Sequence, residues 1–473
     1  MKSKLIITVL TLLLSYTASY SQGYLITKTL PGNDSIAFTT LRYGRHDYGF
    51  GVISSKGVMN WQVAVPGYPL GMGKFKNNVV VFYTFEDLSS LTALKNVHAA
   101  LIGLSEKKII EDKIVYSNET KYQIDPSVLD DPAGNFIYLL IRTTPLRGGI
   151  ASMANNADTK LNETTQLSAI SLEPNLTTQS KDFKSLALES TFVGATSGIN
   201  NDIFISSFSD ERLVTEKFDK DGNLKGKLSV EVPIRNKSKF YPVIKYDSLA
   251  GNCVDIAIAY KNNNKDDVLR SFRFNFNDQK GSASEEAVLN KDYVKQLVHA
   301  QDEKSRLSNF KSIDDLYPVQ IVETNDKVIV LKEIQYHFIP SGSNAEQFYS
   351  DGSIISIYTK KDLHLERDVI IDKSFGTFIM GGTAICSYMK NGKLYTVTCE
   401  LSGPGKTKTF LYTINIDNGS MEKKELEKED AGKGWITDPT TILWFTDNFI
   451  TPFNSAKAFI HLKFETDLQS ANY

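Results

Sequence analysis

Cysteine is scarce in this sequence, and its scarcity bears on how the fold is stabilised. The 473 residues include three cysteines, Cys253, Cys386 and Cys399. Small exported domains that depend on disulfides for their stability carry many more. A chain of this length with so few cross-links must be stabilised instead by a large hydrophobic core.

Two of the cysteines flank the turn "KNGK" and could meet across a hairpin. With Asn-Gly as the two-residue turn, Cys399 lies opposite Ala384, and Cys386 is its diagonal neighbour. A disulfide between Cys386 and Cys399 is therefore permitted but not favoured. We expect Cys253 to be a small, buried apolar residue.

An excess of one charge and the common catalytic motifs are also lacking. The net charge is −2, with 53 basic and 55 acidic residues and no basic stripe, so a nucleic-acid partner is not expected. The sequence contains no Gly-x-Ser-x-Gly elbow, no Gly-Lys-Ser/Thr phosphate loop and no histidine pair at the spacing of a helical metal site. We therefore expect no catalytic residue, no cofactor and no metal ion, although carboxylates that meet only in the folded chain remain open.

The first 21 residues have the order of a secretory signal peptide. Two lysines precede an apolar run over residues 5–14, and small polar residues follow, with Ser19 and Ser21 before the expected cleavage. The run is too short to span a bilayer, no cysteine closely follows it, and no later stretch is apolar enough to cross a membrane. We expect residues 22–473 to be exported to the periplasm, the outer-membrane surface or the extracellular space.

Short apolar runs, many of them β-branched or aromatic, dominate the rest of the chain. Runs such as "VVVFYTF", "FIYLLI" and "VDIAIAY" predict strands that are buried on both faces. A pair of turn residues precedes eight such runs. The pairs are Gly32-Asn33, Asn77-Asn78, Gly134-Asn135, Asn200-Asn201, Gly251-Asn252, Asn325-Asp326, Asn391-Gly392 and Asp447-Asn448. Glycine and asparagine recur because such turns need a positive φ.

Between the turn pairs, each unit has a strand, a tight turn and a more polar strand. A unit thus contains four strands, which defines the blade of a β-propeller. The stretch "KFDKDGNLKGKL" occupies the tight-turn position of its unit. Counted from Asp219 as a calcium loop, it has Gly222 at the fourth position rather than the sixth, and Val230 rather than Glu at the twelfth. We therefore interpret it as a turn.

On these repeated units, the chain resembles secreted bacterial β-propeller proteins of the broad superfamily of WD40-like and quinoprotein-like repeats. The resemblance covers nearly all of the mature chain and implies an all-β fold with one propeller domain over residues 22–473. Only "GVMNW" matches the Gly-x-x-x-Trp tail of the quinoprotein repeat, so quinone binding is not implied.

Eight turn pairs predict eight blades of mostly four antiparallel strands, with seven blades as the nearest competitor. We expect residues 24–30 to form the inner strand of the first blade, which leaves three strands for the last blade. The alternative is that this segment completes the last blade. Either way, the two ends of the propeller should be adjacent, because an open ring would expose an edge strand.

In such a ring, the first-to-second and third-to-fourth turns share one face, here called the short-turn face. The second-to-third loops and the blade-to-blade connections share the other, the long-loop face. Four insertions fall on the long-loop face, at residues 89–95, 142–165, 290–312 and 336–352. The insertion at 290–312 has an apolar helical stripe and predicts a helix near residues 291–312, with Asn290 as its N-cap.

Functional residues of scaffolded folds concentrate on loops of this kind. The candidate binding residues are Arg147, Tyr336, His337, Phe338, Phe348 and Tyr349. Aromatic rings stack on sugars and on protein side chains alike, so the expected partner is a glycan or an envelope protein. We favour a monomeric binding protein without catalysis. The alternative is a propeller-type polysaccharide hydrolase or lyase that uses carboxylates at the central axis.

Mass spectrometry of the exported protein should find its mature N-terminus at or near Gln22. The reason is the order of charged, apolar and small residues, which signal peptidase recognises. Retention of Met1 on the folded, exported protein would contradict this assignment.

Overall fold

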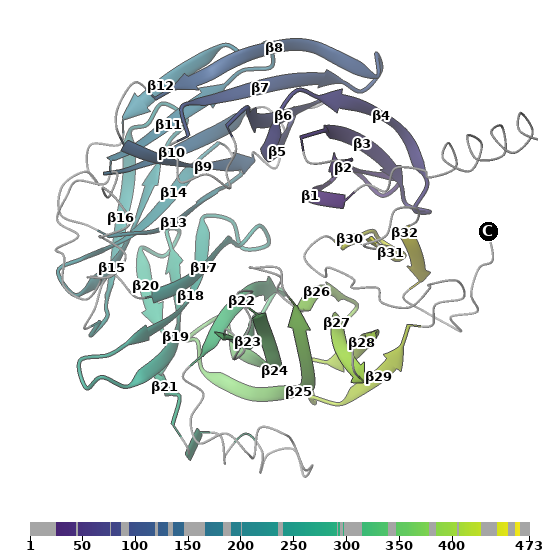
Figure 1. The fold of residues 1–473 in the computed structure, drawn as a ribbon. Coiled ribbons are helices and arrows are strands. Elements are labelled where there is room, and N and C mark those ends of the chain that lie inside the picture. The colour runs from purple at the N-terminus through teal and green to yellow at the C-terminus, as the bar shows by residue number, and fades with distance from the viewer. Residues whose placement is uncertain are drawn as a thin grey trace, which may run out of the picture.

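The strands of the chain form eight antiparallel sheets, arranged as blades around a common axis (Figure 1). The structure, a computed structural model, describes residues 25–43, 46–75, 77–86, 94–118, 122–130, 136–145, 166–182, 191–199, 201–234, 240–290, 292–293, 297, 315–338, 347–377, 385–403, 406–426, 442–452 and 459–463. The predicted all-β propeller is thereby confirmed.

Blades 1 to 4 contain four strands each. Blade 1 has β1 (Leu25–Pro31), β2 (Ile36–Arg42), β3 (Tyr48–Ser54) and β4 (Met59–Val65), and blade 2 has β5 (Tyr68–Phe75), β6 (Asn78–Thr84), β7 (Asn96–Gly103) and β8 (Lys108–Ser117). Blade 3 has β9 (Tyr122–Asp130), β10 (Ile137–Pro145), β11 (Gln166–Leu172) and β12 (Thr178–Asp182), and blade 4 has β13 (Thr191–Ser197), β14 (Ile203–Ser209), β15 (Arg212–Phe218) and β16 (Leu224–Glu231).

Blades 5 to 8 vary more in strand number. Blade 5 has β17 (Phe240–Tyr246), β18 (Cys253–Lys261), β19 (Asp267–Asn275), β20 (Lys280–Ala283) and the short β21 (Ala287–Val288), and blade 6 has β22 (Leu316–Glu323), β23 (Lys327–Phe338), β24 (Gln347–Thr359) and β25 (Leu365–Thr377). Blade 7 has β26 (Ile385–Lys390), β27 (Lys393–Gly403), β28 (Lys406–Asn415) and β29 (Met421–Glu425), and blade 8 has β30 (Leu443–Trp444), β31 (Asn448–Pro452) and β32 (Phe459–Lys463).

Within each blade the strands pair in sequence order, except that β21 pairs with β19, and the first strand is innermost. Every predicted turn pair falls where the first strand of a different blade leads into the second, with Asn78 and Asn448 as the first residues of β6 and β31. The count of eight blades is therefore confirmed, and the competing count of seven is wrong.

The continuous apolar runs follow from the packing of each blade between two neighbours. In β6, Val79, Val81 and Tyr83 belong to a hydrophobic cluster with blade 1, whereas Val80 and Phe82 belong to a cluster with blade 3. All five side chains are at most 1 % exposed. Successive residues of a strand point to opposite faces, so a strand that is covered on both faces shows no polar alternation.

A positive φ occurs in fewer of the turn pairs than the sequence predicts. Among the described residues of these pairs, a positive φ occurs in three pairs, at Asn201, Gly251-Asn252 and Asn391-Gly392, and the pair Gly134-Asn135 lies outside the described residues. In the Gly32-Asn33 pair, the side chain closes the turn instead, because Asn33 Oδ1 accepts hydrogen bonds from the N–H groups of Ser35 and Ile36. Asparagine thus recurs for its side-chain hydrogen bonds as well as for its tolerance of positive φ.

The third-to-fourth turns of blades 1 to 7 share a positive φ much more regularly. One residue in each has φ between 52° and 79°: Gly57, Lys107, Leu176, Gly222, Gln279, Leu363 and Gly419. This regularity is not visible in the sequence, because four of the seven residues are not glycine. A positive φ is sterically unfavourable for these four residues.

The stretch "KFDKDGNLKGKL" is a turn of this class, as predicted. Oδ1 of Asp219 accepts hydrogen bonds from the N–H groups of Asp221 and Asn223, at 2.9 Å each, and Lys225 Nζ lies 2.9 Å from its Oδ2. Burial alone would raise the pKa of Asp219, but the hydrogen bonds from Lys225 and Asn223 lower it. The carboxylate of Asp219, which would be the first ligand of a calcium loop, is therefore engaged in hydrogen bonds within the turn.

The ring closes by packing of blade 8 against blade 1. β1 is the inner strand of blade 1, as predicted, and contacts β30. One buried cluster joins the two blades, with the members Ala37, Ile53, Leu443, Phe445 and Ile450. Beside it, the Thr446 hydroxyl donates to Asp34 at 2.5 Å, and Asn448 Nδ2 donates to the Ser55 carbonyl at 2.6 Å. The described part of blade 8 has three strands, as predicted.

The three cysteines are present as thiols, and no disulfide joins Cys386 to Cys399. In the β26–β27 hairpin, Cys386 lies opposite Val397 and Ile385 lies opposite Thr398. Cys386 and Cys399 are therefore not directly opposite each other, as the two-residue turn requires. Cys253 is fully buried, as expected, and burial raises the pKa of its thiol to about 11.

The helical insertion begins as predicted. Oδ1 of Asn290 accepts hydrogen bonds from the N–H groups of Asp292 and Tyr293, which is the geometry of an N-cap. Asp292, Tyr293 and Leu297 are helical, and the remainder of the predicted helix lies outside the described residues. Within the described residues, no helix has the length and apolarity needed to cross a membrane.

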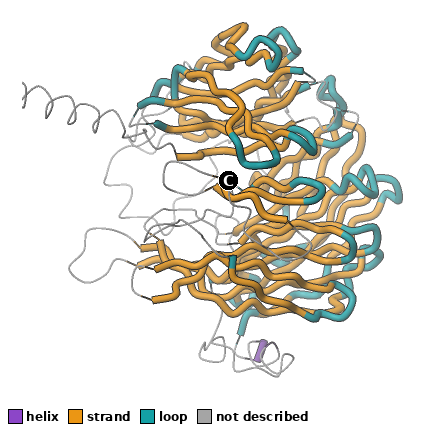
Figure 2. The backbone as a smooth tube through the Cα atoms, turned by 90° about the vertical axis from the view of Figure 1, so that its right-hand side faces the viewer, coloured by secondary structure: helices purple, strands orange, loops and turns teal. Residues whose placement is uncertain are grey.

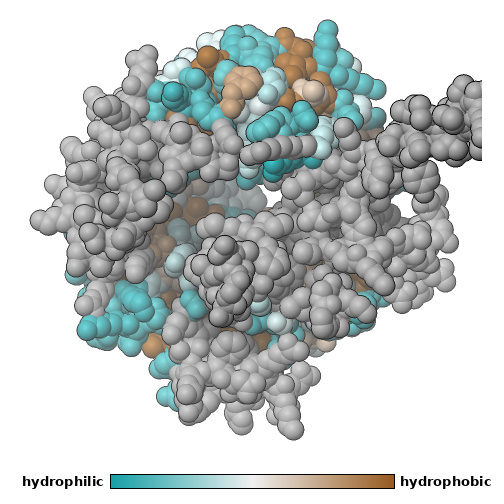
Figure 3. All heavy atoms as spheres, in the orientation of Figure 1, coloured by the Kyte–Doolittle hydropathy of each residue, from teal (hydrophilic) through white to brown (hydrophobic). Residues whose placement is uncertain are grey.

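The two faces of the ring differ as the sequence predicts. In the edge-on view, the described turns gather along one side, at the right of Figure 2. This is the short-turn face. The strands that flank the four insertions end at the opposite, long-loop face, which is the face seen in Figure 1 and Figure 3.

Replacing Ile450 with alanine should lower the free energy of unfolding by about 2–5 kcal/mol, the usual cost of such a truncation in a packed core. Ile450 is fully buried where blade 8 meets blade 1. Urea denaturation measures the change. Val58→Ala is the control, because Val58 is 60 % exposed in blade 1 and should change stability by no more than about 0.5 kcal/mol. Equally small effects in both variants would contradict closure by packing.

Candidate functional site

Two tyrosines from neighbouring blades meet at the long-loop face. Tyr241 is the second residue of β17 and Tyr317 the second residue of β22, the inner strands of blades 5 and 6. Both strands follow blade-to-blade connections, so their first residues lie at the long-loop face and beside the central axis (Figure 1). The two ring centroids are 4.2 Å apart, and the rings are inclined by 55°.

Asp315 completes this group, which we call the axial tyrosine site (Tyr241, Tyr317 and Asp315). The Tyr317 hydroxyl donates a hydrogen bond to Asp315 Oδ1 at 3.0 Å. Tyr241 is 52 % exposed, Asp315 is exposed and Tyr317 is half-buried. Burial and then the neighbouring Asp315 carboxylate raise the pKa of Tyr317, so its hydroxyl remains a donor.

The sequence carries a signal of this site that lies outside the turn-pair pattern. The inner strands of blades 2, 5 and 6 have Tyr-Pro, followed by Leu or Val, from their first or second residue. The dipeptides are Tyr68-Pro69, Tyr241-Pro242 and Tyr317-Pro318. Proline has no N–H to donate and is confined to edge strands, and an inner strand is the edge of its blade. A Tyr-Pro at a strand start thus indicates an aromatic ring beside the axis.

Two further aromatic contacts lie at the long-loop ends of their strands. Arg142 of blade 3 pairs with Asp125 at 2.5 Å, and its guanidinium lies 5.6 Å from the ring centroid of Phe192 in blade 4. In blade 2, Phe85 is 62 % exposed, and its ring contacts that of His98 with centroids 4.8 Å apart. Aromatic surface is therefore distributed over several blades of this face.

The predicted aromatic residues of blade 6 lie in paired strands. The structure pairs Tyr336 with Tyr349, His337 with Phe348 and Phe338 with Gln347. The predicted loop over residues 336–352 is wrong in its extent, because the β23–β24 ladder continues past a register shift between Glu333 and Gln335. The N–H of Gln335 donates to the Asp315 carbonyl, so this extension starts beside the axial tyrosine site. Arg147 lies outside the described residues.

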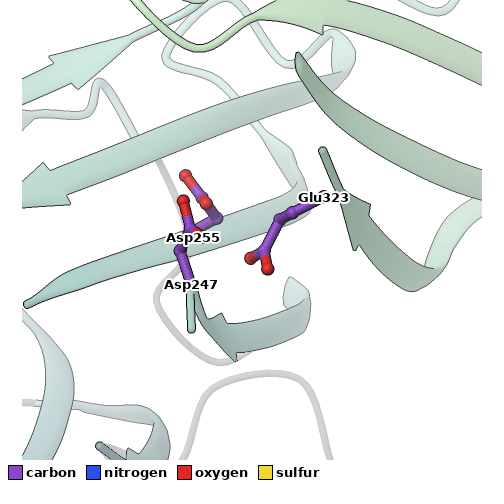
Figure 4. A group of neighbouring side chains, drawn as sticks. All are labelled: Asp247, Asp255 and Glu323. Carbon is purple, nitrogen blue, oxygen red and sulfur yellow. The ribbon is translucent and has the colours of Figure 1, made fainter. Parts of the chain in front are cut away.

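The short-turn face holds a carboxylate group that the sequence does not predict (Figure 4). Asp247 follows β17, Asp255 lies in β18 and Glu323 ends β22. One carboxylate oxygen from each lies within 4.8 Å of the others. The three side chains are at most 3 % exposed. Three buried carboxylates at this spacing would suit a metal ion if no other cation compensated their negative charge.

Two cations already occupy the surroundings of this group. Arg273 donates to Asp255 Oδ2 at 2.5 Å and to Asp247 Oδ2 at 2.7 Å, and Lys360 Nζ lies 2.6 Å from the same Asp247 oxygen. A divalent cation would face the positive charges of Arg273 and Lys360 at short range. The arrangement therefore favours an ion network between blades 5 and 6 over a metal centre.

A third cation, Lys245, lies 3.6 Å from Glu323 Oε2 and is 42 % exposed. Burial raises the pKa of Glu323 to about 8, since this distant, partly solvated lysine compensates its charge poorly. Burial opposes ionisation of Asp247 as well, but Lys360 and Arg273 hold its pKa below the ordinary value. At neutral pH Glu323 therefore holds its proton while Asp247 is ionised.

No family model and no curated protein matches the sequence. Solved structures with a similar fold include the WD40 domain of SCAP from fission yeast, with 9 % identity and a TM-score of 0.42 over 93 % of this chain and 94 % of that chain. The β-propeller domain of the Trilobed protease from Pyrococcus furiosus has 10 % identity and a TM-score of 0.37, over 86 % and 98 %. An oligogalacturonate lyase from Vibrio parahaemolyticus has 9 % identity and a TM-score of 0.37, over 93 % and 98 %. No functional conclusion follows from these similarities.

The free energy of unfolding should decrease as the pH rises from about 6 to about 9. Folded Glu323 has a pKa of about 8, against an ordinary value of 4.5. At a pH between these two pKa values, the folded chain binds more protons than the unfolded chain. The stabilisation that protonated Glu323 contributes is therefore complete below the unfolded pKa and is lost as the pH rises through the folded pKa. Urea denaturation at several pH values measures the slope.

Glu323→Gln, which resembles the protonated side chain, should show a shallower slope over the same range. Glu422→Gln, in the exposed strand β29, is the control and should keep the original slope. An unchanged slope in Glu323→Gln would show that another group is responsible.

Proposed function

We propose that the chain is an exported, monomeric β-propeller that binds a ligand or partner, a glycan or an envelope protein, through its long-loop face without converting it chemically. The half-exposed ring of Tyr241, packed on Tyr317 beside the axis, carries the proposal. Tyrosine rings offer a large, rigid contact area at a low cost in conformational entropy. Export is supported by the order of residues in the first 21 positions.

Within the described residues, the carboxylates support binding over polysaccharide cleavage. Glycoside hydrolysis uses two carboxyl groups that flank the bound chain. The carboxylates that converge do so at the short-turn face, where they are buried and paired with cations. At the long-loop face, Asp125 is paired with Arg142, and Asp315 accepts a hydrogen bond from Tyr317.

Tyr241→Ala should weaken capture of the ligand by immobilised mature chain by about tenfold or more, since tyrosines are frequent hot spots of binding surfaces. Glycan panels and envelope extracts supply the candidates. Leu249→Ala is the matched control, because Leu249 is 58 % exposed in the short-turn face and its loss should leave capture unchanged. Circular dichroism confirms that both variants are folded. Undiminished capture by Tyr241→Ala would overturn the proposal.

A further inference from the structure

The axial tyrosine site forms a platform rather than a cage. A guest held between two aromatic rings needs about 7 Å between the ring planes, twice the contact distance of carbon atoms. The centroids of Tyr241 and Tyr317 are 4.2 Å apart, so nothing fits between them. The exposed side of Tyr241 is therefore the surface that a ligand can cover, and a flat apolar face, such as that of a pyranose ring, matches it.

Asp315 adds a polar partner at the edge of this platform. One oxygen, Oδ1, accepts the hydrogen bond from Tyr317, which fixes the carboxylate beside the rings. An ionised carboxylate only accepts hydrogen bonds, so it suits a ligand with hydroxyl donors. The same charge repels a ligand that carries carboxylates of its own.

Two described cations, one on β17 and one in blade 3, are engaged elsewhere. Lys245, on β17, donates to the Ile321 carbonyl at 3.2 Å and lies near Glu323. Arg142, in blade 3, is paired with Asp125. Recognition of an acidic glycan relies on arginine and lysine side chains that remain available for its carboxylates. The charge that the platform itself presents is thus the Asp315 carboxylate, which disfavours an acidic ligand and suits one that donates through hydroxyl groups.

We propose that the axial tyrosine site binds a neutral, hydroxyl-rich sugar. One face of a pyranose ring stacks on Tyr241, and Asp315 accepts hydrogen bonds from its hydroxyl groups. This inference rests on the proposed function, because it assumes that the long-loop face binds a ligand, and it adds the chemical class of that ligand.

Isothermal titration calorimetry with the mature chain tests this assignment. The probes are a neutral glucan oligosaccharide, an oligogalacturonate and a chitosan oligosaccharide, which differ in charge. The neutral probe should bind. Tyr241→Ala should weaken its binding about tenfold and Asp315→Asn by a similar factor, since stacking and a charge-assisted hydrogen bond each contribute on that scale. Tyr241→Phe keeps the ring and should stay within about threefold.

The remaining outcomes separate this inference from the proposed function. Tyr241-dependent binding of only the anionic or only the cationic probe would overturn the sugar class but leave the binding face in place. If none of the sugar probes binds but an envelope protein is captured in a Tyr241-dependent way, the sugar class is likewise overturned and the binding face remains. Neutral-sugar binding that Tyr241→Ala leaves unchanged would overturn the site itself.

Discussion

The fold depends on every blade having two neighbours. Because successive residues of a central strand face opposite blades, a blade with one free side would expose a continuous apolar surface. β31 shows this requirement at the end of the chain, where Phe449 packs toward blade 7 and Ile450 toward blade 1. The ring must therefore close. Apolar packing and two hydrogen bonds make the junction between the described parts of blades 8 and 1, without a strand from the start of the chain in blade 8.

The sequence predicts the number and order of strands because both follow from local chemistry. Turn residues mark each inner hairpin, and apolar runs without alternation mark strands between two blades. The contact of Tyr241 with Tyr317 and that of Asp247 with Lys360 could not be predicted in this way, because each joins two sheets whose relative position no local pattern encodes. The extent of the β23–β24 hairpin was also not predicted, since Asp351-Gly352, a pair typical of turns, lies inside β24 at a register shift.

Two of the predicted site residues, Tyr336 and Tyr349, lie in the same blade as Tyr317 of the axial tyrosine site. The Tyr336 and Tyr349 backbones pair in blade 6, one residue beyond the bond between Gln335 and Asp315. What the sequence predicts is that the insertions lie on the long-loop face, where functional residues of scaffolded folds concentrate. What it does not predict is the inner-strand position, which depends on how close each strand lies to the axis.

The ion network and the axial tyrosine site are connected by the two strands that carry them. β17 has Tyr241 at one end and leads into Asp247 at the other, and β22 runs from Tyr317 to Glu323. Between the ends, Val243 and Ile321 pack in one cluster.

Breaking a buried ion pair leaves an uncompensated charge, at a cost of about 3–5 kcal/mol. The pair of Asp247 with Lys360 therefore holds the short-turn ends of blades 5 and 6 together. A binding surface that is held on strands in this way is ordered before the ligand arrives, so less conformational entropy is lost on binding than with a surface built from loops.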